Sequence, residues 1–143
     1  MTYTKQLACL LCLLAGFFLK GCEGGETAVI QPNQPLTIAL NQPAEWPQTG
    51  LSLTFTDVLE DSRCPSSVTC VEAGAARITV AVSQPGLAPA SLELNTNPPL
   101  QQDVATYGNF QIQLLKLEPY PEEIRQHIPA RNYQATFVVT ERP

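Results

Sequence analysis

The chain has 143 residues, of which 8 are basic, 13 are acidic and one is histidine, giving a net charge of −5. This acidic excess argues against nucleic acid or an anionic lipid surface as a partner, because both bind basic faces. A single histidine also excludes His-rich metal sites and disfavours a hydrolytic triad, in which an imidazole serves as the base.

Residues 1–21 are predicted to be a lipoprotein signal peptide. A weakly basic start leads into an apolar run at residues 6–19, which is shorter than the roughly 20 residues of a membrane-spanning helix. Leu19, Gly21 and Cys22 resemble a bacterial lipobox. The resemblance implies cleavage before Cys22 and a lipid on its thiol, which would hold the protein on a membrane. A plain secreted protein and an uncleaved anchor are the alternatives.

The remaining chain, residues 22–143, has the length of one domain. It keeps 6 of the 8 basic residues and all 13 acidic ones, a net charge of −7. Residues 22–34 are predicted to be the lipidated cysteine and a tether, and residues 35–143 the folded domain. One lipid-bearing cysteine plus one further pair suits an oxidising compartment, so we expect the bacterial cell envelope, facing the periplasm or the exterior.

Period-two alternation of apolar residues predicts the first strands. The first set is Leu36, Ile38 and Leu40, and the second is Leu51, Leu53 and Phe55. Residues 41–50 between them are predicted to be a loop, with Trp46 set between two prolines. Each strand has one apolar face and one polar or small face, as an antiparallel sheet with one buried side requires.

Cys64 and Cys70, separated by five residues, are predicted to form a disulfide. Zinc sites use other spacings and need further Cys or His ligands, so a metal site and a free or redox-active pair are the weaker alternatives. A closed ring of this size should stabilise the fold by roughly 2 to 2.5 kcal/mol. Pro65 and Gly74 favour a rigid corner against neighbouring backbone.

Arg63 stands among four acidic residues, Asp57, Glu60, Asp61 and Glu72. It is expected to pair with one or two of them, or to lie half buried with its guanidinium on loop carbonyls. The same four acids could instead gather oxygen ligands around Ca²⁺, but no EF-hand spacing is present. The sequence therefore predicts no metal ion and no cofactor.

The stretch from residue 61 to residue 76 carries a motif made of Asp61, Ser62, Arg63, Cys64, Pro65, Cys70, Ala73, Gly74 and Ala76. This stretch resembles a group of small secreted or lipid-anchored bacterial proteins of uncharacterised function, which carry D-S-R-C-P, a second Cys, and then an aromatic residue before A-G-x-A. That aromatic is Trp in the group, where this chain has Glu72. Residues 117–121 and the last strand extend the resemblance loosely. It implies an envelope location and supplies no activity.

Further alternation predicts the later strands. Their apolar positions are Ile78, Val80 and Val82; Leu92 and Leu94; Phe110, Ile112 and Leu114; and Tyr133, Ala135, Phe137 and Val139. Pro85-Gly86 favours a type II turn, and Gly108-Asn109 a two-residue hairpin turn. The adjacent Leu114 and Leu115 indicate a bulge.

Residues 121–129 give a short helical signal of about two turns, with Pro121 at its start and Pro129 at its end. Ile124 and Ile128 would share one side of this helix and cover an end of the core. His127 is expected to be a surface histidine. The fold class is an all-β antiparallel sandwich, immunoglobulin-like, of about seven or eight short strands with this one helix. A small β-barrel is the alternative.

Trp46, Arg63, Glu72 and Tyr120 are the candidate interaction residues, and no catalytic residue is predicted. The favoured function is a lipid-anchored envelope protein that serves as a non-catalytic interaction or structural module, held to the membrane through Cys22 and binding an unidentified envelope protein. One alternative is an enzyme inhibitor that presents the loops at 41–50 and 64–70. The other is a redox or metal-carrying envelope protein.

Overall fold

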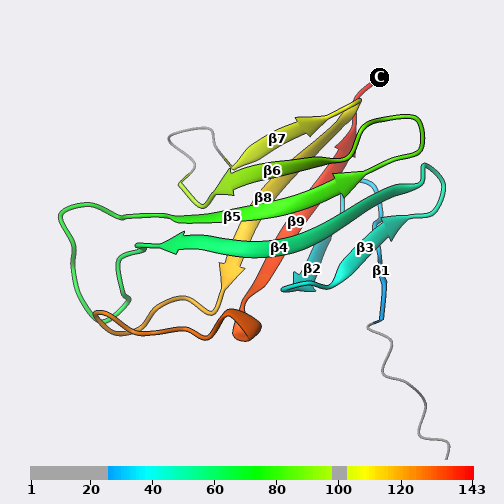
Figure 1. The fold of residues 1–143 in the computed structure, drawn as a ribbon. Helices are drawn as coiled ribbons and strands as arrows, with labels where there is room; N and C mark the ends of the chain where they lie inside the picture. Colours follow the sequence, from blue (N-terminus) through cyan, green and yellow to red (C-terminus); the bar gives the residue numbers. More distant parts are fainter. Residues whose placement is uncertain (1–25, 98–102) are drawn as a thin grey trace, which may run out of the picture.

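The computed structural model describes residues 26–97 and 103–143, which form two packed β-sheets (Figure 1). The five-stranded sheet has the order β1 (Ala28–Val29), β3 (Pro43–Trp46), β4 (Leu51–Asp61), β5 (Ala76–Ser83), β6 (Ala90–Asn95). The four-stranded sheet has the order β2 (Pro35–Ala39), β9 (Gln134–Glu141), β8 (Phe110–Glu118), β7 (Val104–Tyr107). The predicted all-β sandwich is confirmed. The barrel alternative is wrong, because each sheet keeps two free edges.

The core lies between the two sheets and consists of the apolar positions that the alternation marked. In β4, Leu51, Leu53 and Phe55 are almost fully buried, and in β9 Phe137 is likewise buried. The intervening residues of β4 are partly exposed, as expected when one face of a sheet meets water. Neighbouring strands pair antiparallel, except β1, which pairs parallel with β3.

The predicted turns and bulge are present. The Leu87 amide donates to the Gln84 carbonyl, and Gly86 has a φ of 86°, as position three of a type II turn requires. Tyr107 pairs with Phe110 across the β7–β8 hairpin. The register of β8 against β9 shifts just after Leu114.

The helix predicted at residues 121–129 is wrong, because the segment is an irregular loop followed by a 3₁₀ turn, Ala130–Asn132. Gln126 Oε1 accepts hydrogen bonds from the amides of Glu122 and Glu123. Ile124 is 66% exposed whereas Ile128 is partly buried against the core, so only one of the two expected apolar contacts is made. Two turns are marginal without tertiary packing, and here the backbone groups find other partners.

Two further strands were not predicted, which brings the total to nine among the described residues. β3 occupies the middle of the predicted loop at 41–50. β1 and the buried Ile30 lie within residues 22–34, the range assigned to the tether. Cys22 and the signal peptide lie outside the described residues. No helix in the described part of the chain is long and apolar enough to cross a membrane.

Candidate functional site

The long loop between β4 and β5 is closed by the predicted disulfide, which is confirmed. Cys64 and Cys70 are bonded, with their Cα atoms 5.9 Å apart. The start and end of this loop continue the pairing of the flanking strands, since the Ser62 amide donates to the Ala75 carbonyl and the Cys64 amide to the Ala73 carbonyl, both at 2.8 Å. The disulfide therefore closes a loop whose base is already held by the backbone.

Gly74 explains why the loop base can be so tight. Its φ is +64°, which L side chains rarely adopt, and a Cβ atom at this position would lie 1.8 Å from the Ser62 carbonyl oxygen. Only glycine permits this approach of the two backbone segments. The small residue predicted at this corner thus has a definite steric cause.

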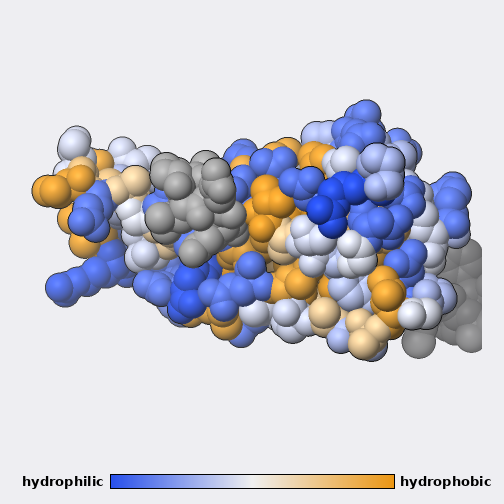
Figure 2. Space-filling view, turned by 90° about the horizontal axis from the view of Figure 1, so that it is seen from above, coloured by the Kyte–Doolittle hydropathy of each residue, from blue (hydrophilic) through white to orange (hydrophobic). Residues whose placement is uncertain are grey.

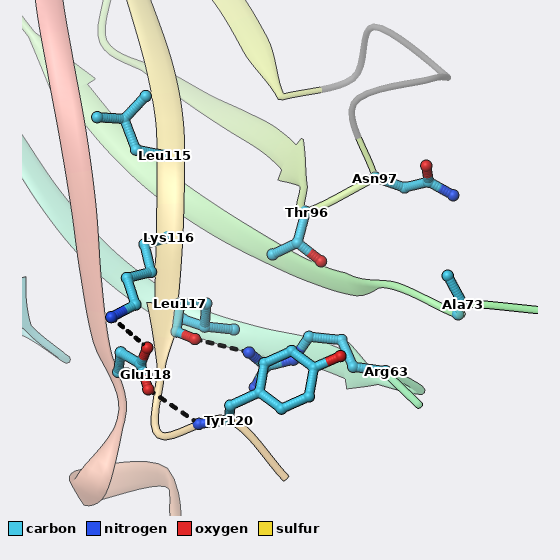
Figure 3. Close-up of a pocket in the computed structure, with 10 residues that line it drawn as sticks. Arg63, Ala73, Thr96, Asn97, Leu115, Lys116, Leu117, Glu118 and Tyr120 are labelled. Atoms are coloured by element: carbon cyan, nitrogen blue, oxygen red, sulfur yellow. Dashed lines mark hydrogen bonds and ion pairs between the residues drawn. The ribbon is translucent and has the colours of Figure 1, made fainter. Parts of the chain in front are cut away.

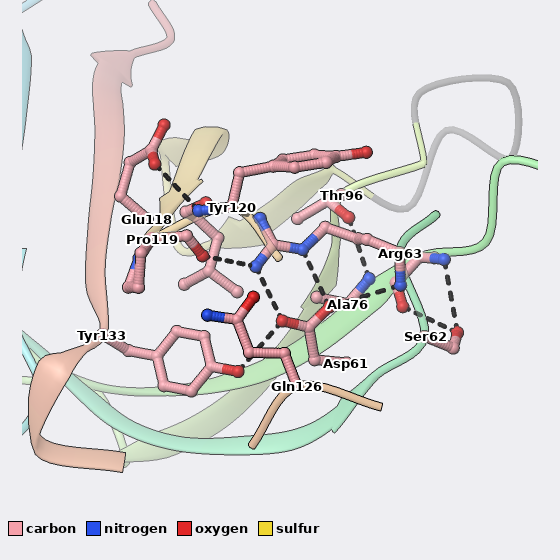
Figure 4. A network of polar contacts seen from close by, with 12 residues as sticks. Asp61, Ser62, Arg63, Ala76, Thr96, Glu118, Pro119, Tyr120, Gln126 and Tyr133 are labelled. Atoms are coloured by element: carbon pink, nitrogen blue, oxygen red, sulfur yellow. Dashed lines mark hydrogen bonds and ion pairs between the residues drawn. The ribbon is translucent and has the colours of Figure 1, made fainter. Parts of the chain in front are cut away.

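Arg63 extends from the same loop into the interior, where only 8% of the residue is exposed. Its Nε and Nη2 atoms donate to the two carboxylate oxygens of Asp61 at 2.8 and 2.6 Å. Nη1 donates to the Leu117 carbonyl at 2.6 Å, and Nη2 also donates to the Pro119 carbonyl at 2.9 Å (Figure 4). Arg63 thus pairs with one of the four acids and also binds two carbonyls, one in β8 and one in the loop that follows, and it is buried where a half-buried side chain was expected.

Asp61 is held on its other side by Tyr133, whose hydroxyl donates to Oδ2 at 2.9 Å. Burial opposes ionisation of Asp61, but the hydrogen bonds and charge of Arg63, with the Tyr133 hydroxyl, outweigh it and hold the pKa below 3.8. Burial and then the bond to Asp61 raise the pKa of Tyr133 to about 12. The arrangement favours a carboxylate, a guanidinium and a neutral phenol.

Tyr120 covers the guanidinium on its remaining side, with Arg63 Cζ 4.8 Å from the centre of the ring. We call this set the Arg63 clamp: Asp61, Arg63, Tyr120, Tyr133 and the carbonyls of Leu117 and Pro119. It joins the end of β4 in one sheet to the end of β8 and the start of β9 in the other. Its first role is therefore to close one end of the sandwich.

A hollow of about 380 Å³ opens beside the clamp, between Arg63, Tyr120 and Leu115 (Figure 3). Lys116 reaches into its rim but is paired with Glu118, and this hydrogen bond and charge lower the pKa of the Glu118 carboxyl. Among the described residues that line the hollow, the charged ones, Arg63, Lys116 and Glu118, are thus already paired within the protein.

The loop after β8 runs beside the disulfide loop at one end of the molecule (Figure 1). The amides of Ser66 and Ser67 donate to the carbonyls of Pro121 and Glu122 at 3.0 and 3.2 Å. We call residues 64–73 and 120–128 together the tip. The two loops brace each other, so the tip is a built surface.

Large apolar side chains project from the tip. Val71 is fully exposed, Ile124 is 66% exposed and Val68 is 37% exposed. Figure 2 shows hydrophobic residues at this end of the molecule. Exposed aliphatic side chains gathered on one braced surface are typical of binding sites.

The four candidate interaction residues do not form one surface. Trp46 ends β3 instead of lying in the predicted loop, and it is only 5% exposed, packed on Phe110 with ring centres 5.6 Å apart. Arg63 is buried, whereas Glu72 and Tyr120 are exposed on the tip. Within residues 26–97 and 103–143, no cluster of His, Cys, Asp and Glu is placed to hold a metal ion.

The role of Tyr133 was missed, although the sequence contained a usable signal. An alternating core position that carries Tyr instead of an aliphatic residue needs a buried partner for its hydroxyl. Asp61 in the motif was the available acceptor. The main-chain acceptors at Leu117 and Pro119 left no signal, because any residue supplies a carbonyl.

Comparison of the chain with protein-family models, with curated protein sequences and with solved structures gave no match.

Proposed function

We propose that the protein is a lipid-anchored component of the bacterial cell envelope, non-catalytic, which docks through its tip on another envelope protein. The lipobox at Cys22 supports the anchoring. The observation that carries the docking is the exposure of Val71, Ile124 and Val68 on two mutually braced loops. A rigid surface loses little conformational entropy when it binds, so such a tip is preorganised for a partner.

The chemistry around the tip favours a protein partner over a lipid surface. Glu72, Glu122 and Glu123 are exposed on the same two loops as the apolar side chains, with one arginine, Arg125. An acidic rim is repelled by anionic lipid headgroups. It complements an apolar cleft bordered by basic residues. The tip also lies at the left of Figure 1, whereas the chain enters the described fold at the right.

The contacts of the motif's polar residues favour a structural role for these residues. Arg63 and Asp61 bind each other, Asp61 also accepts from Tyr133, and Arg63 also donates to two carbonyls. These residues are committed to shaping and supporting the tip.

Anchoring is tested by globomycin, which blocks lipoprotein signal cleavage and should make an unprocessed precursor accumulate. Cys22→Ser should move the protein from the membrane fraction to the soluble fraction. Normal processing under globomycin, together with unchanged membrane partition of Cys22→Ser, would refute the anchor.

Docking is tested separately by site-specific photocrosslinking in cells, with the crosslinking residue at position 72. We expect one adduct of defined mass, lost when Val71→Lys or Ile124→Lys is added. Leu87→Lys is the matched control, since Leu87 is an exposed aliphatic residue at the other end of β5. An adduct unaffected by the tip variants, or equally reduced by the control, would refute docking through the tip.

An inhibitor is the second candidate, favoured by the projection of Val71 directly beside the disulfide. A protease with an apolar specificity pocket would be the target. Purified protein should then inhibit an elastase-type protease saturably at micromolar concentration, and Val71→Lys should abolish that inhibition. Absence of saturable inhibition would retire this candidate.

A further inference from the structure

A second surface of the molecule, remote from the tip, has different chemistry. A groove of about 720 Å³ lies where the chain crosses from β1 in one sheet to β2 in the other. Its principal lining residues are Ile30, Gln31, Gln34, Trp46, Gln48 and Glu141. We call it the glutamine groove. Its volume is in the range of sites that hold small ligands.

Both walls of the groove are fixed by hydrogen bonds. On one side, the Ile30 amide donates to the Glu45 carbonyl at 2.7 Å and the Asn33 amide to the Val139 carbonyl at 3.0 Å, which pins the crossing segment to both sheets. On the other side, the amides of Thr49 and Gly50 donate to the Trp46 carbonyl. The groove is therefore formed before any ligand arrives.

Its polar groups suit a neutral ligand that both donates and accepts hydrogen bonds. Gln31, Gln34 and Gln48 are exposed, and each amide offers donors and an acceptor. Glu141 adds a carboxylate, whose Oε1 accepts a hydrogen bond from the Asn109 side-chain amide. No lysine, arginine or histidine lines the groove among the residues that the structure describes, so a phosphate or another anion would find no counter-charge there.

The apolar part of the lining is Val29, Ile30, Pro32 and Trp46. A ligand with hydroxyl groups around an apolar carbon skeleton matches this combination of amides, carboxylate and apolar side chains. We propose that the glutamine groove binds a neutral saccharide chain. This proposal does not depend on the lipid anchor or on the tip.

Trp46 is the only tryptophan of the chain and lines the groove, so its fluorescence reports on ligand binding there. The purified protein would be titrated with hexamers of β-1,4-linked N-acetylglucosamine, of β-1,4-linked glucose and of α-1,4-linked glucose. We expect a saturable change of Trp46 emission with at least one hexamer, and matching backbone amide shifts at Gln48 and Thr49 by NMR.

The variant Gln34→Ala/Gln48→Ala removes two amides and should weaken that binding by about 30-fold. Gln134→Ala is the matched control, because Gln134 is an exposed glutamine at the far end of β9 from Glu141. Both variants change exposed side chains, and circular dichroism confirms the fold. The proposal is overturned if none of the three hexamers at millimolar concentration changes the Trp46 emission or the amide shifts. It is also overturned if the double variant binds as tightly as the parent protein.

The source of the saccharide is distinguished by a sedimentation assay with isolated peptidoglycan. Co-sedimentation that is lost in the double variant and kept in Gln134→Ala identifies the envelope polymer. Binding of a free hexamer without such co-sedimentation identifies a soluble oligosaccharide. Both results support a saccharide groove.

Discussion

Removing the guanidinium at the centre of the clamp is the sharpest test of what the motif does. Arg63→Ala leaves the Asp61 carboxylate, whose side chain is 11% exposed, with the Tyr133 hydroxyl as its remaining side-chain partner. It also leaves the carbonyls of Leu117 and Pro119 without the donors that now reach them at 2.6 and 2.9 Å.

The magnitude follows from these losses. A buried ion pair that loses one partner typically costs about 3 to 5 kcal/mol, because the other charge stays buried without compensation. Each carbonyl that loses its donor adds roughly 1 kcal/mol, less whatever water recovers at the opened site. We therefore expect a destabilisation of about 3 to 5 kcal/mol, a large part of the stability of a domain of this size.

A second arginine provides the matched control. Arg77 also contacts two carboxylates, Glu60 at 3.3 Å and Glu93 at 2.7 Å, but its side chain is 43% exposed. Arg77→Ala should cost less than about 1 kcal/mol. Urea unfolding, followed by circular dichroism, gives the free energy of unfolding of both variants. The comparison requires that the two variants have equal m-values. If Arg63→Ala is no more destabilising than Arg77→Ala, the clamp does not hold the sandwich closed and the argument fails.

Four further predictions concern the same end of the molecule. Gly74→Ala should prevent native closure of the loop, seen as loss of folded yield, and a folded Gly74→Ala protein of normal stability would contradict the steric account. Cys64→Ser/Cys70→Ser should lower the free energy of unfolding by roughly 2 to 2.5 kcal/mol while the protein stays β-rich, and a domain that no longer folds would show the disulfide to be more than a local staple. Because the pKa of Tyr133 is raised from 10.0 to about 12, its contribution to stability is complete below pH 10 and is lost as the pH rises to 12; Tyr133→Phe should remove this alkaline decline, and persistence of the decline would assign it to another group. Because the pKa of Asp61 is lowered below 3.8, stability should also fall as the pH drops below that value in the parent protein, but not in Asp61→Asn, measured by acid titration of the circular dichroism signal.

The strands that the sequence predicted are those whose burial alternates along the chain. Leu51, Leu53 and Phe55 face the core at every second position, and that spacing is a property of the strand itself. Short edge strands carry a weaker signal. β3 has four residues, begins with Pro43, and follows the chain reversal at Asn41, so its composition is that of a loop.

The false helix shows where local reasoning fails. Residues 121–129 have the prolines, acids and apolar spacing of a short helix, but their backbone carbonyls bond to Ser66 and Ser67 instead. Those partners lie more than fifty positions away along the chain. The candidate site has the same limit. Arg63 and Asp61 could be identified from the motif, whereas only the tertiary fold determines which carbonyls complete the clamp.

Arg63 donates to main-chain carbonyls as well as to the Asp61 side chain, and this difference between its acceptors governs how the clamp positions can vary during evolution. The carbonyl groups of Leu117 and Pro119 are supplied by any residue at those positions, so substitution there does not by itself remove an acceptor. Arg63 and Asp61 have no such freedom, since lysine lacks the planar fork and glutamate has a longer reach. As far as these two hydrogen bonds are concerned, positions 117 and 119 can therefore change while Arg63 and Asp61 must be kept, and purifying selection falls more heavily on the charged pair.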